Sequence, residues 1–483
     1  MAGTERFSSR WGLVAAALGM AIGAGNIWRF PRVVAAQGGG AFILAWLVAL
    51  LVWSLPLLMV EYAVGRKWGG SPLRALVGML GRRWAWAGGF IVLCCVAIMF
   101  YYSVVTAWCL IYLLQTPFLP GDLAGLQGRW GQVQGSWLVV GATALCLAVV
   151  AAVVRLGVRA GIEKTCRILV PSLFVLLAVA ALKAISLPGA QAGLQHLFAV
   201  DFSRLANPRL WLEAFSQSAW STGAGWGLLL VYAGYGGTRS HVTSDCLIAG
   251  LGNNAASLLA ALAVVPTLFA FLPVDEALAV AGQGNQGLAF VWLPRLFLQM
   301  GSWGWVVLLV FFAALLMAAV SSLIAMVELA VRALADLGWE RARALPAVLL
   351  LSLAAATPSA LWPDFFSNQD WVWGLGLLVS GELFCVAALR HGLDELIDSN
   401  SRALTRWWFR WSLLAVIPLA GTAMLGWWFW QSSQWQGANW SNPLLPTSLG
   451  TCLLQWGALL LLLLLANGRL ARRVMLQRET TRE

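Results

Sequence analysis

Charged residues are scarce in this chain of 483 residues. Lys, Arg, Asp and Glu together make up 11% of it, whereas 60% of it is hydrophobic. Such a composition excludes an ordinary soluble protein, which needs a polar face on most of its elements. A bilayer core about 30 Å thick requires about 20 helical residues, and apolar runs such as 136–154, 304–327 and 450–466 satisfy this length. About twelve such runs predict an all-α integral membrane protein embedded in a lipid bilayer.

Histidine is scarcer still, and its scarcity bears on catalysis. The three histidines, His196, His241 and His391, fall in predicted loops far apart in the sequence. No apolar run combines a nucleophile with a base, or places His, Cys and Glu at metal-binding spacing, so we expect no enzyme. The eight cysteines lie in or beside apolar runs, which favours small buried residues over disulfides or metal ligands.

Acidic residues are nearly absent from the middle of the apolar runs. The exceptions are Glu61, Glu328 and Glu382, for which we expect structural roles. This scarcity argues against a proton relay as the main coupling device, because such relays use intramembrane acids in series. The repeated filter segments of many channels are also missing, so a channel is the less favoured alternative.

Positive charge is unevenly distributed along the chain. Most of the 31 Lys and Arg residues lie on one side of the predicted membrane, in clusters over 66–83, 155–167 and 469–473. Because cytoplasmic loops carry an excess of Lys and Arg, this asymmetry predicts that both termini are cytoplasmic. It also explains the net charge of +11 without nucleic acid as a partner. The first apolar run is too long for a signal-peptide core, so we expect no cleavage.

The first apolar run is interrupted about where the bilayer midplane would fall. Gly19, Gly23, Gly25 and Pro31 stand close together there. Glycine costs about 1 kcal/mol relative to alanine inside a helix, and proline removes a backbone donor. A break at this depth frees carbonyl and amide groups, which only protein or a water-filled cavity can satisfy. Free carbonyls suit a hard cation and free amides suit an anion, so the break predicts a site for ions and a small solute.

The sixth apolar run repeats this anomaly. Between Trp220 and Gly227, three glycines stand at alternate positions. Two interrupted helices indicate two five-helix halves, and an odd number of spans inverts the second half, as in inverted-repeat transporters. We therefore expect a cytoplasmic segment over 1–10, a first five-helix repeat over 11–187, an inverted second repeat over 210–390, two further helices over 404–468 and a cytoplasmic tail over 469–483.

Neutral polar residues accompany both breaks. Asn26 follows the first break and Ser221 opens the second, while Asn253 lies in the seventh run and Ser321 and Ser322 lie in the eighth. Each has an ordinary structural explanation, since serine often bonds back to its own helix. If these side chains converge with freed carbonyls, their oxygens form a sodium site without burying a carboxylate.

The same stretches carry a resemblance to a known family. They are the stretch Gly23–Pro31, the stretch Gly38–Phe42, the pair Tyr101–Tyr102, the glycines after Trp220, the pair Ser321–Ser322 and the acid Asp370. From about residue 5 to about residue 390, the chain resembles the neurotransmitter:sodium symporter family, in its bacterial amino-acid branch with the leucine-transporter fold.

The resemblance implies a sodium-coupled symporter that imports a neutral, apolar L-amino acid by alternating access. It implies a multi-pass protein of the bacterial inner (plasma) membrane, a monomer or a homodimer, that carries two sodium ions. The alternative is a carrier for another carboxylate-bearing small solute with chloride or proton coupling.

The resemblance also assigns ligands. The first sodium site would comprise Ala21, Asn26, Ser221 and Asn253, and the second Gly19, Ile22, Ala318, Ser321 and Ser322. The substrate carboxylate would meet the Gly25 amide and the Tyr102 hydroxyl, and the amino group would meet carbonyls near Ala21, Trp220 and Ser221. The side-chain pocket would be lined by Ile98, Trp220, Gly223, Trp226, Ser322 and Met326.

One position separates substrate classes within the family. Monoamine carriers resemble this stretch but have an aspartate where Gly23 stands. That aspartate supplies the anion that a decarboxylated amine lacks. With glycine at this position, the substrate is expected to bring its own carboxylate.

Two gates follow from the same resemblance. Arg29 and Asp370 match the external ion pair, which lies above the site and closes in the occluded state. Asp336 matches the acid of the cytoplasmic gate. The usual arginine partner of that acid aligns with Thr4, and Arg6 is the substitute that we consider.

Chloride dependence stays open. Gln217, Ser221, Asn253 and Ser257 match the chloride-dependent members, and Ser257 stands where chloride-independent relatives often carry a carboxylate. Trp46, however, replaces the tyrosine expected at that site. The resemblance therefore leaves both outcomes open.

Overall fold

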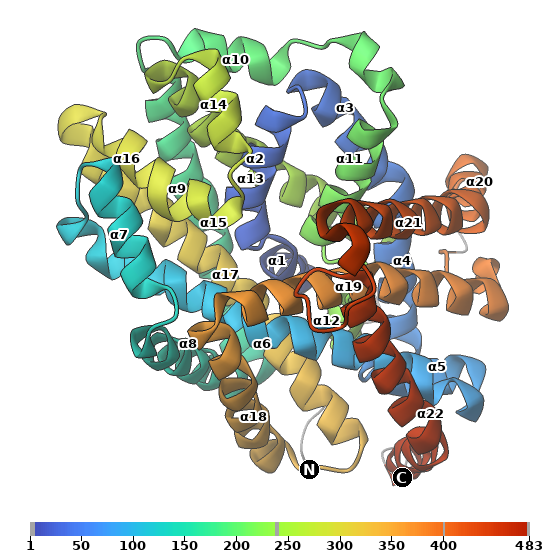
Figure 1. The fold of residues 1–483 in the computed structure, drawn as a ribbon. Helices are drawn as coiled ribbons and strands as arrows, with labels where there is room; N and C mark the ends of the chain where they lie inside the picture. Colours follow the sequence, from blue (N-terminus) through green and yellow to red (C-terminus); the bar gives the residue numbers. More distant parts are fainter. Residues whose placement is uncertain (1–4, 237–240, 399–400, 481–483) are drawn as a thin grey trace.

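The computed structural model describes residues 5–236, 241–398 and 401–480, and in these parts the chain forms helices and no strand (Figure 1). Ten of the described helices are long and apolar enough to cross a bilayer. The pair α1–α2, bent by 54°, brings the number to eleven when it is counted as one span. The multi-pass helical architecture expected from the apolar runs is confirmed.

The first half of the chain alternates long spans with short connecting helices. Its α-helices are α1 (Arg10–Ala21), α2 (Ala24–Ala36), α3 (Gly40–Ala49), α4 (Leu55–Trp68), α5 (Pro72–Leu80), α6 (Ala85–Gln115), α7 (Leu123–Val133), α8 (Trp137–Arg155) and α9 (Lys164–Ile185). Short π or 3₁₀ turns join them at η1 (Leu50–Ser54), η2 (Arg82–Trp84), η3 (Thr116–Phe118) and η4 (Val158–Glu163).

The second half follows the same plan and ends with two further spans. Its α-helices are α10 (Ala190–Phe198), α11 (Pro208–Ser221), α12 (Leu228–Gly234), α13 (Val242–Phe271), α14 (Val274–Ala281), α15 (Asn285–Gly287), α16 (Leu293–Leu298), α17 (Gly304–Asp336), α18 (Arg341–Leu361), α19 (Pro363–His391), α20 (Ala403–Trp411), α21 (Ile417–Gln436) and α22 (Leu449–Thr480). The short turns are η5 (Phe202–Ala206), η6 (Leu288–Trp292), η7 (Gly301–Trp303), η8 (Leu393–Glu395), η9 (Ser412–Val416) and η10 (Gly437–Asn439).

Both predicted helix breaks are present. The first separates α1 from α2 at Ile22 and Gly23. The second separates α11 from α12, where Gly223, Gly225 and Gly227 have φ angles of 75°, 87° and 77°. Residues with a Cβ rarely adopt these left-handed angles, so the alternating glycines are the local cause of the interruption.

The broken helices lie inside the bundle, and the last two spans lie outside it. In Figure 1, α1 and α12 sit near the centre of the molecule, and α1 packs against α9, α13 and α17. Only 28% of the apolar window of the span 403–439, and 17% of that of α22, is buried. Because apolar residues with so little protein contact need a lipid environment, these two spans form the periphery.

One helix boundary differs from the expectation. The last span continues to Thr480, well past residue 468, into the segment predicted as a tail. There, Ala471 and Val474 are buried, and α22 packs against α5. Tertiary burial of these two apolar residues extends a helix that the charged composition of the tail had hidden.

Candidate functional site

A cavity of about 390 Å³ opens beside the two breaks. Nine of the residues expected to contact the substrate line it: Ala21, Gly25, Tyr102, Trp220, Ser221, Gly223, Trp226, Ser322 and Met326. Ile98, also expected there, is fully buried and does not line the cavity. Two segments almost 200 residues apart in the chain thus form one chamber.

The residues expected to bind the first sodium ion converge beside this cavity, and all but Asn253 line it. Asn26 Nδ2 donates to Asn253 Oδ1 at 2.8 Å, and Asn253 Nδ2 lies 3.4 Å from Ser221 Oγ. The side chains of Asn26 and Asn253 are buried, as is that of Ser221. Neutral oxygens from three helices therefore meet within hydrogen-bonding distance of one another.

Asn253 has a second amide orientation with different partners. In that orientation its side-chain nitrogen donates to Ala21 O at 3.1 Å and to Ser221 O at 2.7 Å. These are carbonyl groups at the ends of the two broken helices. The end of the Asn253 amide that lies against Asn26 therefore also lies against Ala21 O and Ser221 O. All four expected ligands of the first sodium ion thus lie around one point.

The residues expected to bind the second sodium ion also meet, with the two serines in different roles. Ser322 Oγ reaches across to α1, where it lies 3.2 Å from Met20 O and 3.4 Å from Ile22 O. Ser321 Oγ instead donates to Ala318 O on its own helix at 3.0 Å. The back-bonding that is common for serine therefore applies to Ser321 and not to Ser322.

Gly19 completes this second group. A Cβ built on Gly19 would lie 3.5 Å from the Cβ of Ser321. The five expected residues thus sit where α1 crosses α17. The carbonyl groups that α1 frees at its end give this crossing its hard oxygen ligands.

The start of α2 presents backbone amides to the cavity. Tyr102 Oη accepts a hydrogen bond from Ala24 N at 3.0 Å, and Asn26 Oδ1 accepts one from Gly23 N at 3.0 Å. The space around Gly25 is open, with no atom within 4 Å of the position of a Cβ. A helix N-terminus with open space in front of it suits an anionic group.

Few of the residues that line the cavity are charged. Arg29, Arg32 and Asp370 are the charged residues among its lining. Arg32 Nε donates to Asn285 Oδ1 at 2.8 Å, and the Arg29 guanidinium lies 5.5 Å from the centre of a Trp220 ring. Arg29 and Asp370, the expected outer gate, line the same cavity but form no ion pair within 4.0 Å.

The expected chloride ligands are buried side by side with two unpartnered donors. Asn26 Nδ2 donates to Ser257 Oγ at 2.7 Å, which links Ser257 to the first sodium group. Neither polar atom of the Gln217 amide has a hydrogen-bond partner, and neither has the indole nitrogen of Trp46. The helix that carries Gln217, α11, packs against the helix that carries Trp46, α3.

Asp336, the acid expected at the cytoplasmic gate, has partners that sequence reasoning did not identify. Its carboxylate accepts from Ser71 N at 2.6 Å and lies 3.4 Å from Arg74 Nη1 and 3.5 Å from Arg332 Nε. Arg6, the substitute considered from the sequence, forms no ion pair with Asp336. Thr4 lies outside the described residues. The only sequence signal for Arg74 was its place in a basic cluster.

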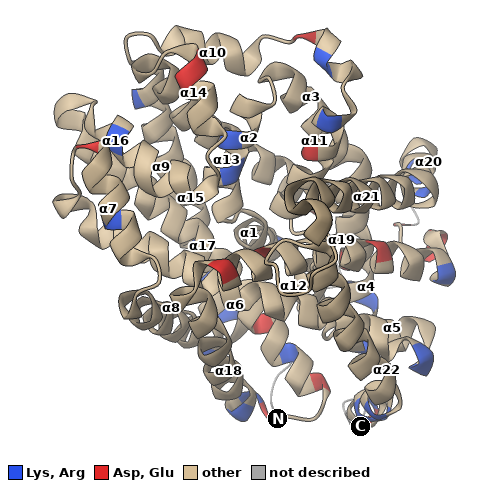
Figure 2. Cartoon of the chain, in the orientation of Figure 1, with Lys and Arg blue, Asp and Glu red and all other residues tan. Residues whose placement is uncertain are grey.

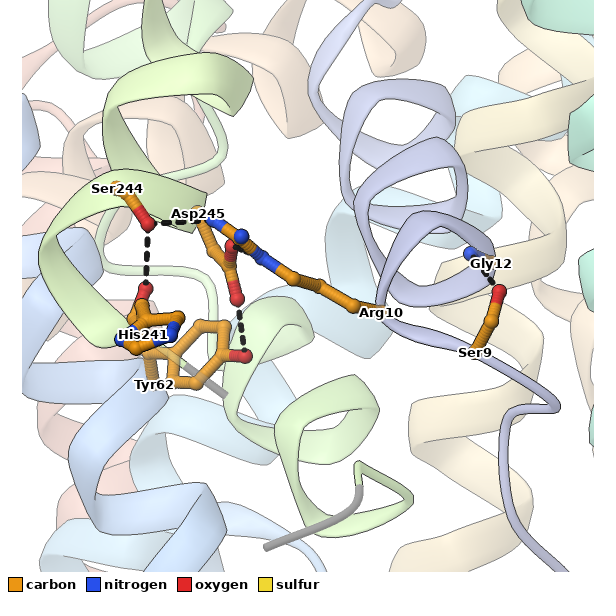
Figure 3. A network of polar contacts seen from close by, with 7 residues as sticks. All are labelled: Ser9, Arg10, Gly12, Tyr62, His241, Ser244 and Asp245. Atoms are coloured by element: carbon orange, nitrogen blue, oxygen red, sulfur yellow. Dashed lines mark hydrogen bonds and ion pairs between the residues drawn. The ribbon is translucent and has the colours of Figure 1, made fainter. Parts of the chain in front are cut away.

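A second network of polar contacts holds the start of α1 (Figure 3). Arg10 Nε donates to Asp245 Oδ1 at 2.6 Å, and Arg10 Nη2 donates to Ser244 Oγ at 2.5 Å. Tyr62 Oη donates to Asp245 Oδ2 at 2.8 Å. Asp245 is the only charged residue of α13. A single acid in an otherwise apolar run was the feature of the sequence that could have indicated this network.

Two of the three acids expected in the middle of the apolar runs stabilise neighbouring elements. Glu61 Oε1 accepts from Gly225 N at 2.6 Å, so it satisfies an amide that the second break leaves free. Glu328 accepts from Tyr235 Oη at 2.6 Å and pairs with Arg341 at 2.6 Å. The structural roles expected for these two acids fit these contacts.

The chain is similar to sodium-dependent transporters over most of its length. The model of the Sodium:neurotransmitter symporter family matches residues 4–124 and 129–466. An uncharacterized sodium-dependent transporter of Methanocaldococcus jannaschii is 35% identical over 452 residues, covering 87% of this chain and 89% of that protein. The sodium-dependent neutral amino acid transporter B(0)AT3 of Mus musculus is 30% identical over 282 residues, covering 51% of this chain and 45% of that protein.

A solved structure shares the architecture. The crystal structure of MhsT in complex with L-phenylalanine aligns with a TM-score of 0.75 and 27% identity, covering 87% of this chain and 99% of that chain. This likeness confirms the leucine-transporter fold that the family resemblance implied.

Proposed function

The chain belongs to the sodium:neurotransmitter symporter family, and from this premise we propose that it imports a neutral, apolar L-amino acid by alternating access. Sodium coupling and multi-pass membrane embedding follow from the family and from the relatives. The substrate class, the inward direction and the count of two sodium ions are the proposal. The distribution of Lys and Arg supports a bacterial inner membrane with both termini in the cytoplasm.

One observation carries the substrate class. Beside the first break, the cavity offers the open amide end of α2 at Gly25 and the Tyr102 hydroxyl. The charged residues of its lining are Arg29 and Arg32, further along α2, and Asp370 on α19. A solute that binds there has to bring its own anion for the helix N-terminus and its own cation for the freed carbonyls. An α-amino acid carries both charges on one carbon.

The walls of the cavity favour an apolar side chain. Trp220 and Trp226 meet edge to face with ring centres 6.3 Å apart, and Met20 and Met326 complete the apolar lining. Aromatic and thioether groups bind apolar side chains and tolerate different shapes. Two relatives support an apolar amino acid as substrate: one is named a neutral amino acid transporter, and the structure of the other was solved with L-phenylalanine.

The residues present suit two sodium ions as co-transported cargo. Each group supplies uncharged oxygen ligands and freed carbonyls, which is the chemistry that a hard monovalent cation needs. Asn26, Asn253 and the carbonyls of Ala21 and Ser221 would hold the first ion. Ser322 with the carbonyl end of α1 would hold the second.

Chloride is a second co-transported ion that one observation favours. Trp46 is a departure from the expected tyrosine, yet its indole N–H is a hydrogen-bond donor, as is the amide of Gln217. Both donors are buried without a partner, an arrangement that costs about 1–3 kcal/mol for each group. An anion bound beside them and Ser257 would remove this cost. A proton-coupled carrier of another carboxylate-bearing solute remains the alternative.

Uptake into proteoliposomes tests the proposal. The purified protein would be reconstituted with an inward gradient of either sodium or potassium and given labelled phenylalanine, leucine, glutamate, lysine or phenethylamine. We expect sodium-driven uptake of phenylalanine and leucine, weak uptake of the charged amino acids and none of phenethylamine. Uptake that is indifferent to sodium, or that includes the decarboxylated amine, would contradict the proposal. Replacing chloride by gluconate tests chloride separately.

A further inference from the structure

Glu382 on α19 is an acid inside a membrane span that the site described above does not use. Glu61 and Glu328, the other two acids expected at this depth, have hydrogen-bonded or ion-paired partners. Glu382 forms no hydrogen bond and no ion pair with the residues that the structure describes, and its Oε1 is buried without a partner. Because ionisable groups inside a membrane normally pair, the lone carboxyl group of Glu382 needs an explanation.

The carboxyl group of Glu382 is packed against the backbone of α21. A Cβ built on Gly421 of α21 would overlap Glu382 Oε1 and would lie 2.8 Å from Glu382 Cδ. The carboxyl group therefore occupies the space that a side chain at position 421 would fill. The same Cβ position is 3.1 Å from Cη2 of Trp53, so an indole ring lies beside the carboxyl group. Glycine at position 421 is what admits an acid between α19 and α21.

The elements packed around this carboxyl group bring no countercharge to it, in the part of the chain that the structure describes. The elements that carry Gly421 and Trp53, α21 and η1, contain no titratable residue (Figure 2). On α19, the titratable side chain within one turn is Cys385, whose Sγ donates to Leu413 O at 3.1 Å. The charged residues of α4 are engaged elsewhere: Glu61 with Gly225, Arg66 with Asp398 and Lys67 with Glu395.

The depth of Glu382 makes its ionised form costly. From Glu382 to His391, where α19 ends, the helix rises about 14 Å at 1.5 Å per residue. This distance places the carboxyl group within a hydrocarbon core about 30 Å thick. Glu382 is partly exposed but does not line the cavity, so lipid and not water borders it. A carboxylate without water or a cation is far more costly there than a neutral carboxyl group.

We propose that Glu382 is a proton-binding site. The carboxyl group carries a proton while α21 is packed against α19, because only the neutral form suits this apolar contact. When the proton is lost in alkaline solution, an unpaired carboxylate lies against Gly421 and weakens the contact. One acid alone forms no relay across the membrane, so the proton serves the packing of α19 and not the coupling of transport. The inference rests on the contacts of Glu382 and is independent of the proposed function.

A hydrophobic carbodiimide tests for the proton. Dicyclohexylcarbodiimide enters a bilayer and reacts with a protonated carboxyl group: the proton moves to one nitrogen of the carbodiimide, and the carboxyl oxygen bonds to its central carbon. A shift of the acyl group to nitrogen then gives a stable acylurea, and no atom leaves. The full-length protein in proteoliposomes would be treated between about pH 6 and about pH 9.5, where ordinary glutamates are ionised throughout. Mass spectrometry of its peptides locates the adduct.

We expect an adduct on Glu382 at the acidic end of this range, with a yield that falls about tenfold per pH unit once the proton is lost. Two other glutamates are controls in the same sample. Glu328 is also inside the membrane but is paired with Arg341, and Glu340 is 74% exposed, so neither should be labelled. Glu382→Gln should remove the adduct and thereby confirm its position.

Thermal unfolding tests the consequence for packing. Glu382→Gln has nearly the shape of the protonated acid but does not ionise. In detergent, the Tm of this variant should match that of the wild type at about pH 6 and exceed it by about 2 °C or more at about pH 9.5. Glu340→Gln, at the exposed acid, should follow the wild type at both pH values. This control separates the charge at position 382 from a general effect of pH on the protein.

Any of three results would overturn the proposal. These are the absence of an adduct on Glu382 at every pH, an equal yield at both ends of the pH range, and a Tm difference between Glu382→Gln and the wild type that does not change with pH. Labelling of the wild type needs no substitution, so it decides the matter even if the variant does not fold. Substrate uptake enters none of these measurements, so the proton site and the transport proposal fail separately.

Discussion

Asn26 is the residue on which the site converges. Its amide oxygen accepts from Gly23 N and thereby caps α2, while its amide nitrogen reaches Asn253 and Ser257. One side chain thus joins the first break to α13 and to the expected chloride ligands. A single amide can do this because it carries both a donor and an acceptor.

Replacing Asn26 by alanine should weaken sodium binding. The variant loses one oxygen ligand and the cap of α2, and hydrogen bonds to charged groups contribute about 1.5–3 kcal/mol each. We expect the sodium concentration for half-maximal binding of labelled phenylalanine to rise by about tenfold or more. Scintillation-proximity binding at several sodium concentrations measures this, with Asn439→Ala on the exposed η10 as control. An unchanged sodium dependence would remove Asn26 from the first site.

Gly23 is the position expected to distinguish substrates that have a carboxylate from substrates that lack one. Its φ of −107° is accessible to any residue, and a Cβ there would lie 3.0 Å from Tyr102 Oη and 3.2 Å from Ser322 Oγ. Both neighbours are ends of side chains that can shift. The backbone therefore accepts a side chain at this position, and the chemistry of that side chain decides the effect.

A pair of variants at Gly23 should separate charge from size. Gly23→Asp places a carboxylate where the substrate carboxylate is expected, so amino-acid uptake should be abolished. Gly23→Ala adds volume without charge and should retain measurable uptake with a raised KM. Uptake of labelled phenylalanine by both variants, at matched amounts of folded protein from size-exclusion chromatography, is the measurement. Equal loss in both would mean that space, and not charge, governs this position.

At the scale of elements, the second break is held from two sides. Ser380 Oγ donates to Gly225 O at 2.5 Å, and Glu61 accepts from Gly225 N at 2.6 Å. Side chains of α19 and α4 thus satisfy the backbone groups that the interrupted helix leaves free. Glycine permits the break, and these two neighbours stabilise it.

Gly225→Ala should therefore destabilise the protein. Its φ of 87° is strained for alanine, and the added Cβ would lie 3.0 Å from the Cα of Gly381. Strain of this kind costs about 1–3 kcal/mol. Gly426→Ala on α21, where no atom lies within 4 Å of the Cβ position, should instead be neutral or stabilising. Thermal unfolding in detergent measures both, and a lower Tm for the α21 variant alone would contradict this account.

At the scale of the whole molecule, the two ends of the transport path differ. The outer gate residues Arg29 and Asp370 are unpaired with each other, and the cavity extends past them. At the end expected to be cytoplasmic, Asp336 pairs with Arg74, and Asp245 pairs with Arg10. If the chain transports as proposed, ion pairs at one end and a cavity open at the other are the arrangement expected of an outward-open conformation.

Breaking the inner ion pair should shift the protein toward the inward-open conformation. Arg74→Gln removes a cation from the buried Asp336, and breaking a buried pair costs about 3–5 kcal/mol. Arg74 is itself 15% exposed, so we expect a smaller shift, seen as lower sodium affinity and faster labelling of Cys166 beside Gly19. Arg343→Gln, at a residue that is 80% exposed, is the control. Unchanged labelling would leave Asp336 outside the gate.

The charge moved in each cycle distinguishes the possible ion counts. Two sodium ions with a zwitterion move two charges inward, and each charge gains about 2.3 kcal/mol per 100 mV. An inside-negative potassium diffusion potential should therefore increase accumulation strongly. If one chloride ion is co-transported, only one net charge moves inward, and the accumulation of substrate should depend on the membrane potential correspondingly less. Accumulation that is indifferent to potential would contradict the two-ion count with or without chloride.

The sequence by itself determined the spans, the two breaks and most of the residues named in advance that line the cavity beside the breaks. These are local properties, because the length of an apolar run and the absence of a Cβ act without long-range contacts. The motif around Asn26 and the pair Ser321–Ser322 are therefore recognisable from the order of the residues alone.

Only the tertiary structure decided which groups meet. Arg74 became the partner of Asp336 because α5, a short helix outside the predicted spans, places it there. Likewise, Ser322 bonds to α1 whereas its neighbour Ser321 bonds to its own helix. The physical reason is that successive residues of a helix point about 100° apart, so the packing of α17 against α1 gives each serine a different partner.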